Sequence, residues 1–294
     1  MKNKLTLKKL SPYGYILPIG IILFSFYVIP MIMSIYFGFT QYNGNTPSQF
    51  IGLENYKDLL TDSMFKDSLK NTLIFSAVSV PLQTLLALVF AVWLTSKQSK
   101  LHNFVKGVIF IPVISSMILI GIIWKVFLNS DSSPLNLIFE LFGGTAPSWL
   151  GDPRLTLFTL IAISIWKNVG YFVVIYVAGI MDIDRNVYEA ARLDGAGKLR
   201  EFKDITLPLL KPTSIMVVFL GIIWSFQTFE LVYYMTGGGP GTRSMTLVLD
   251  IYNLAFKQFN VGYAMAVANV LLLIVAIISI LQKTLLKKDK STIY

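Results

Sequence analysis

The sequence contains no cysteine and a single histidine, His102, in 294 residues. Without cysteine the chain can form no disulfide, no Cys-ligated zinc or iron–sulfur site and no thiol nucleophile. One histidine leaves no His pair for a metal and little room for acid–base catalysis, and we expect His102 to be solvated in a short loop. Charged residues make up only 14% of the chain, against about 25% in ordinary soluble domains. These shortages predict no catalytic residue, no metal site and no cofactor in this chain.

Hydrophobic residues make up 54% of the chain instead, and they are gathered into six blocks. Each block is long enough to cross a hydrocarbon core of about 30 Å, which takes roughly 20 helical residues. The first block exceeds the roughly 7–15 apolar residues of a signal peptide, so we expect it to be kept as a helix, bent at Pro18 and Pro30. The pattern predicts an all-α integral membrane protein with six transmembrane helices over residues 13–282, between tails 1–12 and 283–294. The six blocks are Tyr15–Phe39, Leu73–Thr95, Val108–Leu128, Leu155–Met181, Ser214–Met235 and Ala264–Leu281.

The distribution of Lys and Arg predicts the orientation of these helices. Seventeen of them lie in the two tails and in the loops after the second and fourth blocks, and at most seven lie in the other loops. Since Lys and Arg accumulate on the cytoplasmic side, we expect both termini to be cytoplasmic. The net charge of +9 is then a signal of topology, and we expect no nucleic-acid partner.

The loop after the fourth block, residues 182–208, is the most structured polar segment of the chain. Asn186 is placed to cap a helix, with Glu189 three residues later, as in a capping box. Gly195 and Gly197 favour a break, because glycine adopts positive φ at little cost. A second helix is predicted from Lys198 to about Leu207, ended by Pro208. From these features alone, the segment could be an amphipathic hairpin on the membrane surface.

Specific residues in this loop carry a resemblance. Glu189, Ala190 and Ala191, then Gly195, then Ile205, Leu207 and Pro208 fit the pattern E-A-A-x3-G-x9-I-x-L-P at all seven positions. The loop resembles the coupling segment of ABC-importer permeases. The resemblance implies that these residues, together with Asp194, dock on an ATPase and transmit its movements.

The same loop contains a glycine-rich run that superficially suggests nucleotide binding. The segment 195–198, Gly-Ala-Gly-Lys, looks like the end of a phosphate-binding P-loop. That motif also requires a glycine at the position of Arg192 and Ser or Thr at the position of Leu199. The chain therefore lacks the motif, and we expect ATP to be bound by separate subunits.

Further segments resemble the carbohydrate-uptake branch of these permeases, of the maltose, oligosaccharide and glycerol-3-phosphate type. The resemblance implies a type I importer core in a bacterial inner or plasma membrane. It also implies a second, related permease subunit, two ATP-binding subunits, an extracytoplasmic solute-binding protein or lipoprotein, and a carbohydrate solute of unspecified identity. A secondary transporter driven by an ion gradient is the alternative. The segments are 11–18, 52–56, 193–196, 226–229 and 236–240.

A solute pathway is predicted in the fourth and fifth blocks. Small, polar and aromatic residues there recur at helical spacing, which places them on one face of each helix. The resemblance implies sugar contact at these positions, while helix packing explains small and polar residues equally well. The residues are Asn168 and Tyr171 in the fourth block, and Gly221, Trp224, Ser225 and Thr228 in the fifth.

Other polar residues are left open between pathway and helix interface: Lys167, Gln227, Glu230 and Asn269. We expect the run Gly237–Gly241 to form a tight turn rather than a phosphate loop, because no helix with a Lys at the required spacing follows it. Tyr252, Phe256 and Phe259 are predicted to form a short interfacial helix facing a binding protein.

Overall fold

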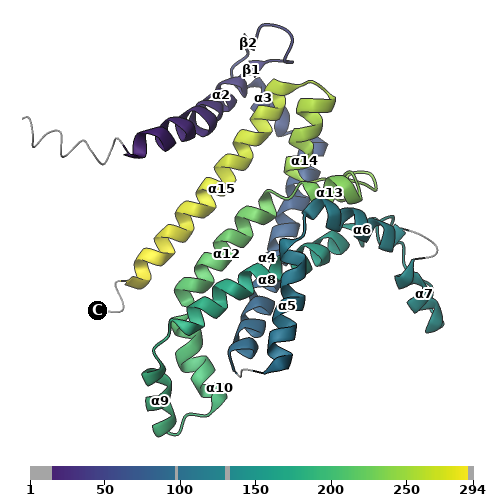
Figure 1. Ribbon diagram of the computed structural model, residues 1–294. Coiled ribbons are helices and arrows are strands. Elements are labelled where there is room, and N and C mark those ends of the chain that lie inside the picture. The colour runs from purple at the N-terminus through teal and green to yellow at the C-terminus, as the bar shows by residue number, and fades with distance from the viewer. Residues whose placement is uncertain (1–14, 97–98, 130–132, 291–294) are drawn as a thin grey trace, which may run out of the picture. The chain divides into compact units, whose positions relative to one another are not determined.

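The computed structural model describes residues 15–96, 99–129 and 133–290, and almost all of its regular structure is helical (Figure 1). The chain divides into two compact units. Among the described residues, the first unit comprises 15–62 and 251–270, and the second comprises those of 63–250 and 271–290. Each unit is described by itself.

The first unit begins with a long apolar helix, Tyr15–Phe37, two residues shorter than predicted at its end. It contains the π-helical turn η1 (Phe24–Val28), followed by α2 (Ile29–Phe37) with Pro30 in its first turn. Pro30 has no N–H and its ring collides with the carbonyl four residues earlier. The wider π turn, in which the Ile29 N–H bonds to the Phe24 carbonyl, accommodates the proline without ending the helix.

Short elements complete this unit. The strands β1 (Thr40–Gln41) and β2 (Gln49–Phe50) pair antiparallel, with Thr40 opposite Phe50. They are followed by α3 (Glu54–Leu59) and, much later in the chain, by the end of α14 (Leu247–Tyr252), by η3 (Asn253–Lys257) and by the start of α15 (Val261–Lys290). The helix predicted around Tyr252 and Phe256 is therefore present, but it ends before Phe259, which the prediction had included and whose φ is +54°.

Amide side chains tie the distant parts of the first unit together. Asn55 is buried, and its Nδ2 donates to the carbonyls of Gly38 and Thr40, each at 3.0 Å. Asn269 Nδ2 donates to the Ser34 carbonyl at 3.2 Å and to the Tyr56 hydroxyl at 3.0 Å. The helix-packing interpretation of Asn269 is thus confirmed.

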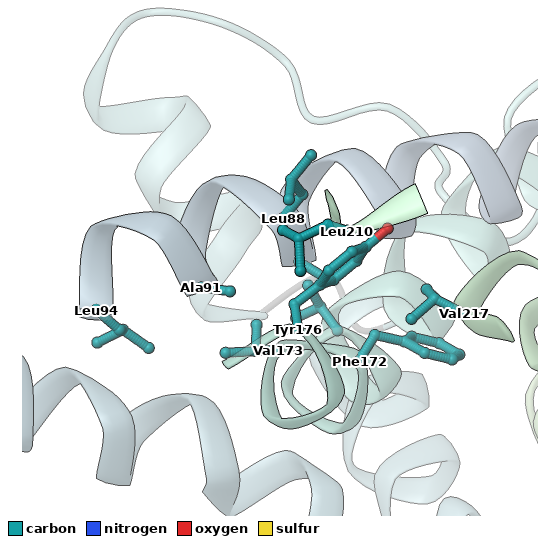
Figure 2. Close-up of a cluster of buried hydrophobic side chains, with 10 residues drawn as sticks. Leu88, Ala91, Leu94, Phe172, Val173, Tyr176, Leu210 and Val217 are labelled. Carbon is teal, nitrogen blue, oxygen red and sulfur yellow. The ribbon is translucent and has the colours of Figure 1, made fainter. Parts of the chain in front are cut away.

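The second unit is built on three helices: α4 (Ser63–Ser96), α8 (Thr156–Met181) and α12 (Lys211–Phe226). Figure 2 shows their shared core, in which α4 contributes small and branched side chains opposite Phe172 and Tyr176 of α8. Ala87 and Ala91 are fully buried. Since apolar burial gives little driving force inside lipid, such small residues stabilise the contact by allowing close packing.

A glycine permits a close helix crossing in this unit. α5 (Lys100–Ile114) packs on α8, and a Cβ added at Gly170 would lie 2.5 Å from the Ile109 carbonyl oxygen and 2.7 Å from a methyl of Val113. Backbone atoms cannot move aside as a flexible side chain can. Only glycine fits at this crossing.

The third and fifth predicted spans are broken. α5 and α6 (Met117–Asn129) meet at an angle of 101°, where Ser115 and Ser116 separate them. In the fifth span, α12 ends at Phe226 and α13 covers Glu230–Met235. A short helix, α7 (Pro134–Leu141), precedes α8.

Four helices in the described part of the chain are long and apolar enough to cross a membrane, and up to six spans result if each bent pair is one span. Those four include α4 and α15, which begin before the predicted blocks, at Ser63 and Val261. The prediction of an all-α membrane fold is confirmed, and six spans are the upper limit of what the helices provide.

Candidate functional site

The loop 182–208 folds as a helical hairpin in the second unit (Figure 1). Its first helix, α9 (Arg185–Leu193), is capped by Asp184, whose Oδ1 accepts from the Asn186 N–H at 2.9 Å. The prediction of Asn186 as the cap was therefore wrong by two residues. Both side chains can cap a helix, and Asp184 is the one that stands outside the first helical turn.

The turn of the hairpin depends on Gly195. Its φ is +78°, its N–H bonds to the Arg192 carbonyl at 3.0 Å, and the Ala196 N–H bonds to the Ala191 carbonyl at 2.9 Å. This pair of bonds is a Schellman motif, which ends a helix with glycine in the left-handed region. The predicted break at Gly195 is confirmed, whereas Gly197 has φ of −79° and caps the next helix.

The returning arm comprises α10 (Lys198–Glu201), the π turn η2 (Phe202–Thr206) and α11 (Leu207–Leu209). Pro208 was predicted to end this arm, but the helix continues through it to Leu209. As at Pro30, the proline is the second residue after a five-residue π turn, and the wider turn absorbs its missing hydrogen bond. The chain bends instead at Leu210, where α12 leaves at 64°.

Two side-chain bridges join the arms of the hairpin. Arg192 Nε donates to Glu201 Oε1 at 2.7 Å, and the hydroxyls of Tyr188 and Thr206 lie 2.9 Å apart. The hydrogen bond from Arg192 holds the pKa of Glu201 below its ordinary value, and the same bond raises the pKa of Arg192. No feature of the sequence pattern singled out these four residues, because the pairing exists only once the hairpin has closed.

The hairpin presents its signature residues outward. Glu189, Ala190, Asp194, Gly195, Leu207 and Pro208 are exposed, and Ala191 and Ile205 are half-buried. At the turn, Leu193 is 89% exposed and Leu199 is 80% exposed. A braced hairpin with two leucines and small residues on its surface is suited to insertion into a partner.

The predicted stripe on α12 divides between two environments. Gly221 faces α4, where an added Cβ would lie 2.5 Å from Gln83 Nε2. Ser225 is buried, and its Oγ donates to Ser76 Oγ of α4 at 2.8 Å. These two residues pack helices, as the alternative interpretation proposed.

The aromatic members of the stripe do meet. The rings of Tyr171 on α8 and Trp224 on α12 have centroids 4.8 Å apart, and Phe172 lies 5.4 Å from Trp224. Tyr171 remains 39% exposed and Trp224 is half-buried. This pair offers an accessible aromatic platform of the kind on which a sugar ring can stack.

The two remaining polar residues of the predicted pathway lie at the borders of this aromatic platform. Asn168 is half-buried, one turn before Tyr171, and donates to Ser164 Oγ at 3.3 Å. Thr228 lies beyond the end of α12, and its hydroxyl donates to the Trp224 carbonyl at 3.2 Å.

Among the other residues named from the sequence, His102 differs from expectation. His102 is buried rather than solvated, because its ring stacks on Trp93 at 4.2 Å and its Nδ1 lies 2.6 Å from Ser99 Oγ. Lys167 and Glu230, both described, form no ion pair within 4 Å, and Gln227 and Glu230 are exposed. The glycines of 237–241 form a turn, as predicted, with positive φ at three of them.

Comparison with known proteins agrees with this geometry. Over residues 83–288 the chain matches the family described as binding-protein-dependent transport system inner membrane component. It is 34% identical over 286 residues to the probable ABC transporter permease protein YurN of Bacillus subtilis, covering 96% of this chain and 98% of that one. It is 32% identical to the trehalose/maltose transport system permease protein MalF of Thermococcus litoralis, covering 95% of each.

A solved structure has the same fold. One chain of a bacterial ABC transporter involved in the import of the acidic polysaccharide alginate superposes with a TM-score of 0.84 at 24% identity, covering 97% of this chain and 99% of that one. The type I permease fold implied by the resemblance to carbohydrate-uptake permeases is confirmed by this likeness. The chain belongs to the family of binding-protein-dependent transport system inner membrane components, the multi-pass permeases of ABC importers.

Proposed function

We propose that the chain is the permease subunit of an ABC importer that moves a carbohydrate into the cytoplasm, with ATP hydrolysed by separate subunits. The observation that carries the proposal is the braced hairpin with the seven-position signature on its surface. The trehalose/maltose relative from Thermococcus litoralis supports a sugar as the solute. The lack of a P-loop at residues 192–199 supports a partner ATPase.

The proposed coupling site comprises Glu189, Ala190, Ala191, Asp194, Gly195, Ile205, Leu207 and Pro208. ATP-driven closure of two ATPase subunits moves the docked hairpin, and the bend at Leu210 passes this motion to α12. Leu210 is fully buried in the core of α4, α8 and α12, which supports a stiff connection. The excess of Lys and Arg in this loop and in the tails supports its cytoplasmic side.

The proposed complex contains this chain, a second related permease, two ATP-binding subunits and an extracytoplasmic solute-binding protein, in a bacterial plasma membrane. A related solved transporter chain was crystallised in complex with a periplasmic protein carrying an alginate pentasaccharide. Along the pathway, the solute rests on Tyr171 and Trp224, bordered by Asn168 and Thr228. Gly221 and Ser225 hold α12 against α4 behind that surface.

The test is uptake by the reconstituted complex in proteoliposomes. We expect transport of a labelled sugar only with ATP inside and binding protein outside. Transport that persists under a proton or sodium gradient without ATPase subunits contradicts the proposal and favours a secondary transporter. A complex with Gly195→Val should hydrolyse ATP while importing little sugar, and normal import by that variant contradicts the role of the hairpin.

A further inference from the structure

A charged cavity in the second unit has no role in the proposal above. It has a volume of about 630 Å³, within the range of about 300–1,000 Å³ typical of small-molecule pockets. It lies between the first turns of α4, the start of α8 and the loop before α14, all on the side predicted to be extracytoplasmic. Its lining comprises Asp67, Lys70, Asn71, Ile74, Pro153, Arg154, Leu157, Phe158, Thr242 and Arg243.

The charge of this lining is strongly unbalanced. Lys70, Arg154 and Arg243 are exposed, and none of the three forms an ion pair with a described residue. The one carboxylate in the lining, Asp67, accepts a hydrogen bond from the Thr242 hydroxyl at 2.6 Å. Three cations without partners around one cavity attract an anion.

The loop that carries Arg243 is fixed to α4. Asn71 is buried, and its Nδ2 donates to the carbonyls of Thr242 at 2.7 Å and Met245 at 2.9 Å. One turn away in the chain, the Leu247 N–H donates to the Thr72 hydroxyl at 2.9 Å. The backbone that carries Arg243 is therefore held beside the one that carries Lys70 before any ligand arrives, which lowers the cost of ordering a site.

The rest of the lining is apolar. Phe158 is 52% exposed, and Ile74, Pro153 and Leu157 complete the wall. An aromatic face beside cationic groups matches a molecule with an apolar ring face and an anionic substituent. Arginine binds carboxylates with two parallel hydrogen bonds, which adds orientation to attraction.

We propose that this cavity receives an acidic sugar, with its carboxylate among Lys70, Arg154 and Arg243 and its ring against Phe158. This inference rests on the proposed function, because it narrows the carbohydrate to an anionic one. The cavity is the first contact of the solute with this chain, on the outer side of the aromatic platform.

The test uses the complete complex in lipid nanodiscs, with a galacturonic acid disaccharide and the matched neutral galactose disaccharide as probes. Calorimetry should show tighter binding of the acidic disaccharide, weakening as salt rises. In the triple variant K70Q/R154Q/R243Q its affinity should fall at least about tenfold, because several charge-assisted hydrogen bonds are lost. The variant R154K/R243K keeps the positive charge but loses the bidentate geometry of arginine, so its affinity should lie between that of the wild type and that of the triple variant. It also reports whether the site still folds.

A second triple variant, K57Q/K66Q/K257Q, is the matched control. It removes the same net charge from residues outside the cavity lining, and we expect unchanged affinity. Equal binding of the two disaccharides, or equal loss in both triple variants, overturns the inference. Unchanged affinity with reduced stimulation of the ATPase by the binding protein also overturns it, and assigns the cavity to protein docking.

Failure of this inference and failure of the proposed function are distinguishable. If ATP and binding protein drive import of the neutral disaccharide while the acidic one does not bind, the importer function stands and the anionic solute is excluded. If neither sugar is imported with ATP, the proposed function fails, whatever the cavity binds.

Discussion

The hairpin 182–208 and the stripe on α12 were both predicted from short sequence patterns, and the structure explains their residues in different ways. In the hairpin, Gly195 occupies the position that its backbone conformation demands, with φ of +78° and two local hydrogen bonds. In the stripe, Gly221 and Ser225 are explained by Gln83 and Ser76, which lie over 130 residues earlier in the chain. The local conformation of a turn depends on residues next to it in the sequence. The partner of a packed helix face, by contrast, comes from a distant part of the sequence.

The largest expected effect distinguishes a helical glycine that is required by close packing from one with open space around it. Gly170→Ala places a methyl against the backbone of α5, so we expect destabilisation of about 1–3 kcal/mol. Gly107→Ala is the control, because nothing lies within 4 Å of its added Cβ, and alanine in a helix is favoured over glycine by about 0.5–1 kcal/mol. Thermal unfolding of the purified variants should shift in opposite directions. A shift in the same direction contradicts the crossing at Ile109.

Next in size is the effect of Gly195→Val. The left-handed conformation costs a residue with a side chain about 1–2 kcal/mol, so the docked hairpin becomes less populated and uptake should fall about tenfold at unchanged thermal stability. Gly197→Val is the matched substitution, since Gly197 has negative φ and open space around it. Equal losses of uptake in the two variants would show that bulk, not backbone conformation, limits docking.

The variants Trp224→Ala and Ser225→Ala test whether the two parts of the stripe on α12 have different roles. Removing one ring of the aromatic platform should weaken sugar binding about threefold to tenfold, since such contacts are worth about 0.5–1.5 kcal/mol. Ser225→Ala should instead lower stability by about 0.6 kcal/mol, a typical value for an interhelical hydrogen bond, and leave affinity unchanged. Titration of the complex with sugar and thermal unfolding check the two halves. The division fails if the serine variant loses affinity and the tryptophan variant does not.

The smallest effect concerns the bridge between the hairpin arms. Because Arg192 lowers the pKa of Glu201, the bridge is complete above the unfolded-state pKa of Glu, about 4.3, and is lost as pH falls through the lowered folded value. Hydrogen exchange of amides 195–201, corrected for intrinsic rates, should reveal opening of the turn below that pH. Glu201→Gln should open to a similar extent at pH 7 and change little on acidification. Identical pH profiles for wild type and variant exclude the bridge as a brace.

The sequence was sufficient to predict the structure where the residue type alone determines the local backbone conformation. Helical regions came from apolar blocks, and the turn came from Gly195. It failed at Pro208, because a π turn that precedes a proline cannot be recognised from residue types, and the same device at Pro30 was predicted only as a bend. His102 was misplaced since burial against Trp93 requires two helices to meet. The bridge of Arg192 and Glu201 lies across a turn, so nothing in the sequence around either residue indicates the pairing.

Leu193 and Leu199 at the turn of the hairpin have a consequence for biogenesis. Burying a leucine fully is worth about 1.5–3 kcal/mol relative to leaving it in water. Because these two leucines are 89% and 80% exposed, the unassembled subunit has an apolar tip that favours non-specific association. A cell that synthesises this chain ahead of its ATPase leaves that tip uncovered, where chaperones and proteases recognise it. If the hairpin docks as proposed, matched production of the subunits is favoured by the same two exposed side chains.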